Sequence, residues 1–261
     1  MLNFAANLSF LFTDRPFIER FVAAKNAGFD SVEYLFPYDY PAEQIKEILN
    51  DSGLEQALFN AFAGDWDAGE RGLAALVGRE SEFKASIEQA ASYAEVLGNQ
   101  RIHIMSGLAD FTDSNAFETY LSNISWAADQ LKLSGINALI EPINSRDMPG
   151  YFLTTPAQAA EVIQLANRAN LKMQFDLYHA QIMCGDLVTH LERCWPMIDH
   201  LQVASVPHRN EPSSGEINYP YLFSWLDQKG YQGFIGCEYR PKTTTLEGLG
   251  WLSEYKRSFN G

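Results

Sequence analysis

The stretch Asn137-Ala138-Leu139-Ile140-Glu141-Pro142-Ile143-Asn144 combines an apolar run, an acid and a proline. A short apolar run is typical of a strand in a parallel sheet, because both faces of such a strand are covered. Pro142 has no N–H to donate to a neighbouring strand, so we expect the strand to end there. Glu141 would then stand at the carboxyl end of a buried strand, where α/β enzymes carry their chemistry.

Two later segments repeat this pattern of an apolar run that ends in an acid. They are Lys172-Met173-Gln174-Phe175-Asp176 and Phe234-Ile235-Gly236-Cys237-Glu238. Between them, His200-Leu201-Gln202-Val203 places a polar side chain inside a strand-like run. We therefore expect the function to depend on four residues: Glu141, Asp176, Gln202 and Glu238.

Strand and helix patterns alternate along the whole chain. Expected strands lie at residues 4–9, 31–35, 56–60, 101–105, 137–141, 172–176, 198–203 and 234–238. Expected helices lie at residues 13–28, 41–53, 79–97, 116–133, 155–169, 186–194, 219–230 and 246–258. Eight strand–helix units in one order are what a (β/α)8 barrel requires. The competing fold, an open doubly wound sheet, usually has a glycine-rich turn after its first strand, and residues 9–13 contain no glycine.

Two of the expected helices have recognisable starts. Thr13-Asp14-Arg15-Pro16 and Thr155-Pro156 each combine a capping residue with a first-turn proline. The apolar residues that we expect the first helix to carry are Phe17, Phe21, Val22 and Ala24.

The length and the charge of the chain limit the classes of protein to which it can belong. The chain has 261 residues and no linker-like segment, so we expect a single barrel domain over residues 1–261. Its 33 acidic and 19 basic residues give a formal charge of −14, which would repel the phosphate backbone of nucleic acids and anionic membranes. No apolar run approaches the roughly 18 residues of a transmembrane helix. We expect neither nucleic acid nor a membrane as a partner.

The start of the chain and its cysteines favour the cytoplasm. Met1-Leu2-Asn3-Phe4 lacks the basic region of a signal peptide and resembles a strand. Three cysteines without CxxC spacing are typical of free thiols in a reducing compartment: Cys184, Cys194 and Cys237. The sequence leaves the oligomeric state open and is compatible with a homo-oligomer.

In a barrel, the four polar residues would come from neighbouring strands and meet at one mouth. Three crowded carboxylates repel one another at low dielectric, so protons, basic residues or a cation must neutralise them. Oxygen ligands suit Mg²⁺ or Mn²⁺. The opposing interpretation is that an acid at a strand end caps a helix or forms a loop salt bridge, and that Gln202 only satisfies backbone groups. The pattern predicts a divalent ion held by Glu141, Asp176, Gln202 and Glu238.

Other polar residues are candidates for substrate contacts. His179 and His208 fall in expected loops after strands, and His103 lies on a strand, with either an inward-facing or a structural role. Arg209 offers the fork geometry that pairs with a carboxylate, although a loop salt bridge is equally compatible. Further candidates for contacts or pocket walls are Asn7, Phe10, Phe12, Glu33, Asn60, Trp66 and Tyr178. His190 and His200 are expected to be a surface residue and a structural residue. Two long polar loops, 64–72 and 207–218, are expected to be functional.

At these residues the chain resembles the hydroxypyruvate isomerase family of the xylose isomerase-like barrels. The resemblance covers nearly the whole chain, and its motifs are Asn3-Phe4-Ala5-Ala6-Asn7, Ile140-Glu141-Pro142, Phe175-Asp176-Leu177-Tyr178-His179, Arg209-Asn210-Glu211-Pro212 and Gly215-Glu216-Ile217-Asn218. The four-residue set also resembles the metal site of ketose 3-epimerases, which typically have a histidine where Gln202 stands. That difference favours an isomerase, but it does not separate hydroxypyruvate from 2-oxo-tetronate as the substrate.

The resemblance implies interconversion of hydroxypyruvate and 2-hydroxy-3-oxopropanoate through an enediolate. Glu141 and Glu238 would exchange the roles of acid and base, and the divalent ion would stabilise the enediolate. His179 and Arg209 would hold developing charge or the substrate carboxylate. The substrate implied is a small 2-oxo or hydroxy acid.

Three other functions are compatible with a barrel of this kind. A DNA-repair phosphodiesterase has a related fold but several more histidine ligands, and a charge of −14 opposes binding to a polyanion. A non-catalytic sugar-acid binding protein would keep a pocket without needing both glutamates. A ketose epimerase would change stereochemistry rather than the position of the carbonyl group.

Overall fold

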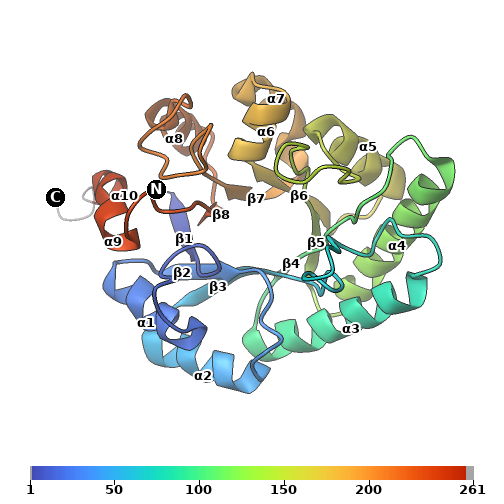
Figure 1. Cartoon of the computed structure of the whole chain (residues 1–261), viewed down its shortest axis with the longest axis horizontal. Coiled ribbons are helices and arrows are strands. Elements are labelled where there is room, and N and C mark those ends of the chain that lie inside the picture. The colour runs from blue at the N-terminus through green and yellow to red at the C-terminus, as the bar shows by residue number, and fades with distance from the viewer. Residues whose placement is uncertain (1, 257–261) are drawn as a thin grey trace.

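The computed structural model describes residues 2–256. The strands are β1 (Asn3–Asn7), β2 (Ser31–Tyr34), β3 (Glu55–Asn60), β4 (Arg101–His103), β5 (Asn137–Ile140), β6 (Leu171–Asp176), β7 (Ile198–Gln202) and β8 (Phe234–Cys237). All are parallel, each pairs with the next along the chain, and β8 pairs with β1, which closes the barrel (Figure 1). The predicted (β/α)8 barrel is confirmed, and the open doubly wound sheet is excluded.

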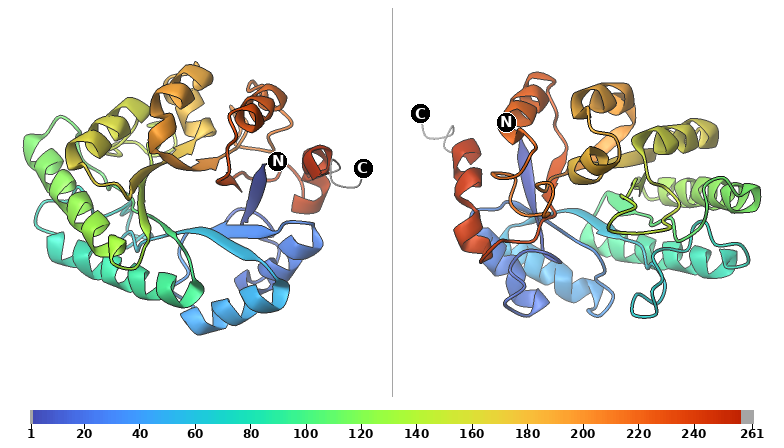
Figure 2. Two further views of the ribbon diagram at one scale, coloured as in Figure 1. Left: turned by 180° about the vertical axis from the view of Figure 1, so that it is seen from behind. Right: turned by 45° about the horizontal axis from the view of Figure 1, so that its top comes forward.

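Helices follow every strand and surround the barrel (Figure 2). They are α1 (Phe17–Asn26), α2 (Ala42–Ser52), α3 (Glu80–Leu97), α4 (Ser114–Lys132), α5 (Pro156–Ala166), α6 (Leu177–Met183), α7 (Leu187–Cys194), α8 (Tyr219–Gln228), α9 (Thr245–Gly248) and α10 (Gly250–Lys256), with a short 3₁₀ helix at Trp195–Met197. Among the helices of residues 2–256, none has both the length and the apolar character needed to cross a membrane.

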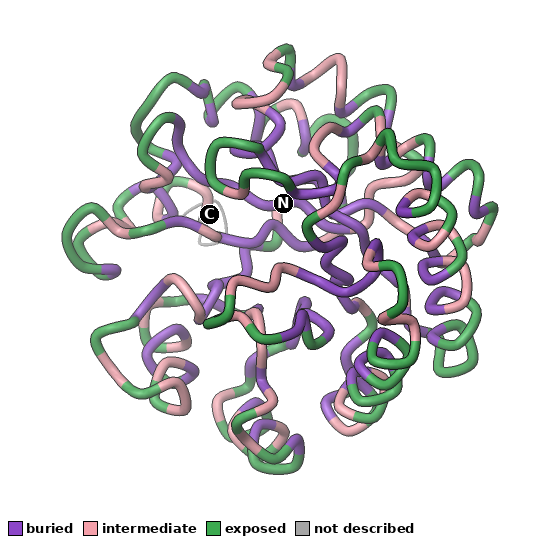
Figure 3. Tube along the Cα trace, turned by 45° about the vertical axis from the view of Figure 1, so that its right-hand side comes forward, coloured by how far each residue is buried: buried purple, intermediate pink, exposed green. Residues whose placement is uncertain are grey.

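The strands are buried, and each helix turns one face towards them (Figure 3). In α1, Phe21 and Ala24 are fully buried, whereas 53% of Val22 is exposed. Val22 lies on this helix as expected, but outside its buried face. The buried stripe of an amphipathic helix runs at spacings of three and four residues, and the position next to Phe21 lies about 100° away from that stripe.

One of the two predicted helix starts is confirmed. Thr155 caps α5: its hydroxyl accepts from the N–H of Gln158, and the Gln158 side chain accepts from the N–H of Thr155, which forms a capping box. The start of α1 differs, because Pro16 is the N-cap residue and no side chain caps this helix. Thr13 is exposed and outside the helix.

Helix α6 was not expected. The sequence places a loop after Asp176, but α6 begins directly at Leu177, and the carboxylate of Asp176 accepts from the N–H of Tyr178. His179 therefore lies on a helix rather than in a loop. The expected C-terminal helix over 246–258 is divided into α9 and α10, and its last two residues lie outside the described part of the chain.

The register brings the functional strand ends to one level. Asp176 is paired with Gln202, and Gln202 with Gly236. Glu141 and Glu238 are the first residues after β5 and β8. All four polar residues predicted from strand ends therefore lie at the same end of the barrel.

Candidate active site

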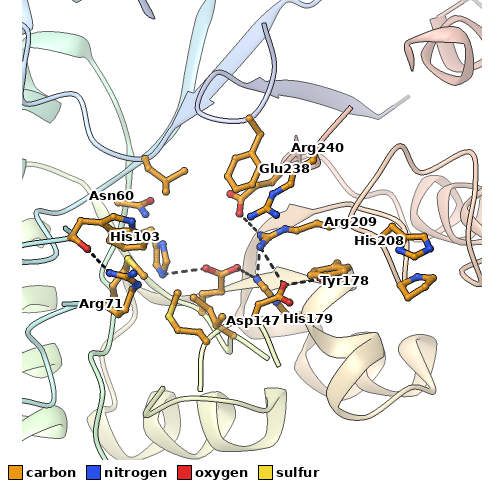
Figure 4. A pocket seen from close by; sticks show the side chains of 18 residues that line it. Asn60, Arg71, His103, Asp147, Tyr178, His179, His208, Arg209, Glu238 and Arg240 are labelled. Carbon is orange, nitrogen blue, oxygen red and sulfur yellow. Dashed lines mark hydrogen bonds and ion pairs between the residues drawn. The ribbon is translucent and has the colours of Figure 1, made fainter. Parts of the chain in front are cut away.

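A cavity of about 670 Å³ opens at the carboxyl ends of the strands (Figure 4). Five of the predicted site residues line it: His103, Glu141, His179, Arg209 and Glu238. Three others are buried and contact those residues from below: Asn7, Asp176 and Gln202.

Glu141 and Asp176 are buried carboxylates with unsatisfied oxygens. Glu141 Oε1 and Asp176 Oδ2 have no hydrogen-bond partner within residues 2–256. Burial, and then the charges of Glu238 and Asp176, raise the pKa of Glu141 well above its ordinary value. Burial also raises the pKa of Asp176 to about 6, although Arg209 opposes this change. Both groups therefore need a proton or a cation to balance their charge.

Arg209 supplies one positive charge among these acids. Its Nη2 lies 2.6 Å from Glu238 Oε1 and 3.9 Å from Asp176 Oδ2. The guanidinium carbon is 5.0 Å from the ring centroids of both Phe10 and Tyr178, so aromatic rings also hold it in place. Burial lowers the pKa of Arg209, but the neighbouring carboxylates raise it, and the net change is upward. The Nη1 and Nη2 atoms of this guanidinium face protein carboxylates, whereas its Nε is buried without a hydrogen-bond partner among the described residues.

Glu238 is held by amide groups as well as by Arg209. The side-chain amides of Asn7 and Gln202 donate to Glu238 Oε2 at 2.9 and 2.8 Å. The same two amides donate to Glu33 Oε1 at 2.9 and 2.8 Å, so they bridge the two glutamates. Burial nevertheless raises the pKa of Glu238 to about 8, against the opposing charge of Arg209. Glu238 can therefore hold or release a proton near neutral pH.

The neighbours of His179 determine its tautomer. The N–H of Asp147 donates to Asn144 Oδ1 at 2.8 Å, which turns the amide nitrogen of Asn144 towards His179 Nδ1, 2.6 Å away. Nδ1 is therefore the acceptor, and the proton of the neutral ring resides on Nε2. Burial lowers the pKa of His179 well below its ordinary value, so the ring is neutral. Its Nε2–H faces Asp176 Oδ2 at 3.5 Å and Glu141 Oε1 at 3.9 Å.

His103 contributes a second neutral imidazole to the wall. Burial lowers its pKa to about 3, and its Nε2 lies 3.5 Å from Glu141 Oε2. The sequence left open whether His103 faces inward, and the structure places it in the cavity lining.

Other candidates from the sequence divide between the cavity and the barrel interior. The cavity lining includes Phe10, Asn60, Trp66, Tyr178 and His208. Two expectations are wrong: Phe12 and Glu33 are buried and do not line the cavity. The N–H of Phe12 donates to the hydroxyl of Thr245, the first residue of α9. His200 is fully buried, and its Nε2 lies 2.7 Å from Glu33 Oε2, in keeping with the expected structural role.

The donor set fits a divalent cation in part. Ligand-type atoms of Glu141, Asp176 and His179 lie within 4.8 Å of one another. The two carboxylates offer unpaired oxygens, whereas the His179 nitrogen that faces them carries a proton in this tautomer. The oxygens of Gln202 and Glu238 are engaged, since Gln202 Oε1 accepts from Gln174 at 2.7 Å and Glu238 accepts from Arg209. When ionised, Glu141, Asp176 and Glu238 carry three negative charges against the one positive charge of Arg209. The difference of two nevertheless matches the charge of a divalent ion.

The sequence reasoning missed three residues that shape the site. Asn144 and Asp147 orient His179 and Tyr178, since Tyr178 donates to Asp147 Oδ2 at 2.8 Å. Asn144 lies three residues after Glu141, and its place just beyond the strand end is the sequence signal for a role in the site. The third is Arg71, a basic residue in the long loop 64–72 that lines the cavity.

The chain is similar to known proteins along nearly its whole length. Residues 21–255 match the family model described as xylose isomerase-like TIM barrel. A 2-oxo-tetronate isomerase from Cupriavidus necator is 51% identical over 98% of this chain and 99% of its own length. A hydroxypyruvate isomerase from Escherichia coli is 45% identical over 98% of this chain and 100% of its own length.

A solved structure gives a similar result for the fold. It is named AP endonuclease, family 2, from Brucella melitensis, and it is 48% identical with a TM-score of 0.96. The match covers 98% of this chain and 99% of that one.

Proposed function

The chain belongs to the xylose isomerase-like TIM barrel family and is an isomerase, and on this basis we propose that it moves the carbonyl group of a short 2-oxo sugar acid to the adjacent carbon. Hydroxypyruvate is the three-carbon substrate of this kind, and 2-oxo-tetronate is the four-carbon alternative. The relative named for 2-oxo-tetronate shares 51% of its residues with this chain, against 45% for the relative named for hydroxypyruvate.

The observation that carries the proposal is the pair Glu141 and Glu238. Both side chains line one cavity, and burial raises the pKa of each. A carboxyl group whose pKa lies nearer to neutrality is better suited to both accepting and returning a proton. Two such groups on one cavity can divide a proton transfer between adjacent carbons, with one removing the proton and the other returning it.

The reaction needs no external oxidant or reductant. In hydroxypyruvate, one glutamate removes a proton from the CH₂OH carbon, which leaves an enediolate spread over two carbons and their oxygens. A proton returned to the former carbonyl carbon gives 2-hydroxy-3-oxopropanoate, with the hydroxyl proton transferred between the two oxygens. Glu141 and Glu238 lie in the wall where these transfers would take place.

A neutral hydrogen-bond donor is available for the developing oxyanion. The Nε2–H of His179 is fixed by Asn144 and faces the acidic side of the cavity. Such a preorganised donor stabilises charge that develops on a substrate oxygen. A divalent ion, when bound, would act as a Lewis acid on the substrate oxygens. Glu141 and Asp176 would hold it with their unpaired oxygens, and Gln202 and Glu238 would join them as ligands only on releasing Gln174 and Arg209.

The test is isomerisation followed by NMR in D₂O, with hydroxypyruvate and 2-oxo-tetronate as substrates. We expect deuterium to enter at carbon in the presence of Mg²⁺ or Mn²⁺, and activity to fall on treatment with a chelator. Glu141→Gln and Glu238→Gln should each lower kcat by a factor on the order of 10²–10⁴, as is usual for loss of an acid–base group.

The controls separate loss of chemistry from loss of fold. Glu211→Gln removes a carboxyl group that accepts from the N–H of Lys242 and does not line the cavity, so it should retain activity. Near-normal turnover in both folded Glu→Gln variants would eliminate the two-glutamate mechanism. A wild-type protein that exchanges no carbon-bound proton of either acid would be a binding protein rather than the proposed isomerase.

Cleavage of DNA is a second candidate, because the 48% identical structure carries the name AP endonuclease. A formal charge of −14 opposes this reading, since binding to a polyanion requires basic contacts with phosphates. A nicking assay on DNA that contains an abasic site, with Mg²⁺ or Mn²⁺, distinguishes the two. We expect no nicking above that of the Glu141→Gln variant.

A further inference from the structure

Arg71 is a cation of the cavity wall that the reaction described above does not use. Its guanidinium carbon lies 4.0 Å from the ring centroid of Trp66, and both residues line the cavity. Nη1 donates to the carbonyl oxygens of Trp66 and Glu70 at 2.9 and 2.6 Å. These contacts hold the guanidinium in one orientation and leave Nη2 and Nε, the two donors of one edge, without a protein partner in the described structure.

Arg71 differs in charge balance from Arg209, the arginine that the sequence suggested for a carboxylate contact. Arg209 already lies against Glu238 and Asp176. Within the part of the chain that the structure describes, no carboxylate forms an ion pair with Arg71. Figure 4 shows Arg71 on the side of Asn60 and His103, across the cavity from Arg209. Arg71 therefore offers an uncompensated charge to whatever the cavity holds.

The backbone next to Arg71 is fixed by close packing. Gly72 has a φ of 121°, and a Cβ atom there would come within 2.4 Å of the carbonyl oxygen of Met105. The N–H of Gly72 donates to Ala63 at 2.9 Å, and Gly72 forms an isolated bridge with Ser106. The loop thus crosses the end of β4 at van der Waals distance, and Arg71 is positioned before any ligand arrives.

We propose that Arg71 binds the carboxylate of the substrate through the Nε and Nη2 edge of its guanidinium, an inference that rests on the proposed isomerase function. A planar fork of two N–H donors matches a carboxylate, and such paired, charge-assisted bonds are stronger than neutral ones. This assigns to Arg71 the carboxylate contact that the sequence suggested for Arg209. Because Arg71, Glu141 and Glu238 line the same cavity, a substrate held at Arg71 would share that space with both glutamates.

The experiment measures kcat and KM of Arg71→Met with hydroxypyruvate and with 2-oxo-tetronate. We expect KM to rise ~10- to 100-fold, the range for loss of charged hydrogen bonds, with a much smaller change in kcat. In dihydroxyacetone a CH₂OH group replaces the carboxylate, so the activity of the variant on this compound should equal that of the wild type. Arg71→Lys keeps the charge without the fork, and its KM should lie between those of the wild type and Arg71→Met. This variant tests the proposal if Arg71→Met folds poorly.

The matched control is Arg240→Met. Arg240 also lines the cavity, but it is exposed, and its side chain has no hydrogen bond or ion pair among the described residues. Its removal should change KM for the acids by less than about threefold, because an exposed charge is screened by solvent. Equal rises in KM for Arg71→Met and Arg240→Met would indicate that any positive charge in the cavity attracts the acid, and would contradict a carboxylate site at Arg71.

The outcomes distinguish this inference from the proposed function. If wild-type protein isomerises neither acid, the function and the inference fall together. If wild type is active and the folded Arg71→Met and Arg71→Lys variants keep the wild-type KM for both acids, the inference alone is wrong. A fall in kcat with unchanged KM would equally overturn it, because it would mean that Arg71 only shapes the loop.

Discussion

Three buried or nearly buried carboxylates, Glu141, Asp176 and Glu238, surround the guanidinium of Arg209 at one end of the barrel, and a fourth, Glu33, lies beneath them. The carboxylates of Glu33 and Glu238 accept hydrogen bonds from Asn7 and Arg209. In contrast, Glu141 Oε1 and Asp176 Oδ2 have no hydrogen-bond partner in residues 2–256. An unpaired charge in a medium of low dielectric is costly, and proteins relieve the cost by protonation or by binding a cation.

A divalent cation is predicted to raise Tm more at pH 8 than at pH 5.5. Burial raises the pKa of Asp176 to about 6 and that of Glu238 to about 8, so the folded chain holds these protons more tightly than the unfolded chain. The stability from these protons is complete below the unfolded pKa of about 4 and is lost as pH rises through the folded values. A cation competes with the protons, and binds best once they have left. At a hundredfold excess over Kd, binding adds about 2.7 kcal/mol.

Differential scanning calorimetry with and without Mg²⁺ or Mn²⁺ checks this prediction. Asp176→Asn should reduce the rise in Tm, because it removes a charged ligand. Asp199→Asn is the control, since Asp199 pairs with Arg101 and Asn137 at the start of β7, away from the cavity. A rise that is the same at both pH values, or that survives in Asp176→Asn, would contradict a cation site at these carboxylates.

Sequence reasoning located the acids of the site better than it located their partners. Glu141, Asp176 and Glu238 were predictable because an acid at the end of an apolar run can be read locally. The pairing of Arg209 with Glu238 and the free edge of Arg71 were not, because both depend on contacts between distant loops. The direction in which the amides of Asn7 and Gln202 face is likewise set by Glu33, a residue 26 positions from Asn7 and 169 from Gln202.

At the scale of one helix, the cap of α5 makes a measurable contribution to stability. Thr155→Ala removes the hydroxyl that accepts from Gln158, and we expect it to lower the free energy of unfolding by about 1 kcal/mol. Urea unfolding monitored by circular dichroism measures the change. Thr13→Ala is the matched control: Thr13 resembles a cap in sequence but is exposed and caps no helix, so its replacement should have almost no effect. Equal losses in both variants would rule out the cap as the cause.

The elements themselves were largely predictable, and the exceptions have physical reasons. Alternating patterns gave all eight strands, because buried parallel strands are short apolar runs between helices. Helix α6 was not predicted because no turn separates it from β6: Asp176 ends the strand, and its carboxylate accepts from the N–H of Tyr178, the second residue of the helix. The seven residues of α6 are also too few for a clear helical periodicity.

At the scale of the whole molecule, a polar network crosses the interior of the barrel beneath the cavity. Glu33 on β2 contacts His200 on β7 at 2.7 Å, and it contacts Asn7 on β1 and Gln202 on β7 through their amides. Those amides continue to Glu238, the residue after β8. The network thus connects β1, β2 and β7 with the end of β8, and it links the packing of the interior to the position of a catalytic candidate.

Gly236 on β8 has no side chain, which leaves room for the carboxylate of Glu33 in this network. Gly236→Ala should therefore destabilise the protein. A Cβ atom at this position would come within 2.2 Å of Glu33 Oε1, and the carboxylate could avoid it only by leaving His200 and the amides. Breaking a buried, hydrogen-bonded charge costs about 3–5 kcal/mol, which guanidinium chloride unfolding would detect. Gly250→Ala is the control, because a Cβ atom there meets nothing within 4 Å. The double variant Gly236→Ala with Glu33→Ala should lose less than the sum of the single losses, since the clash disappears; strict additivity would show that Glu33 is not what Gly236 accommodates.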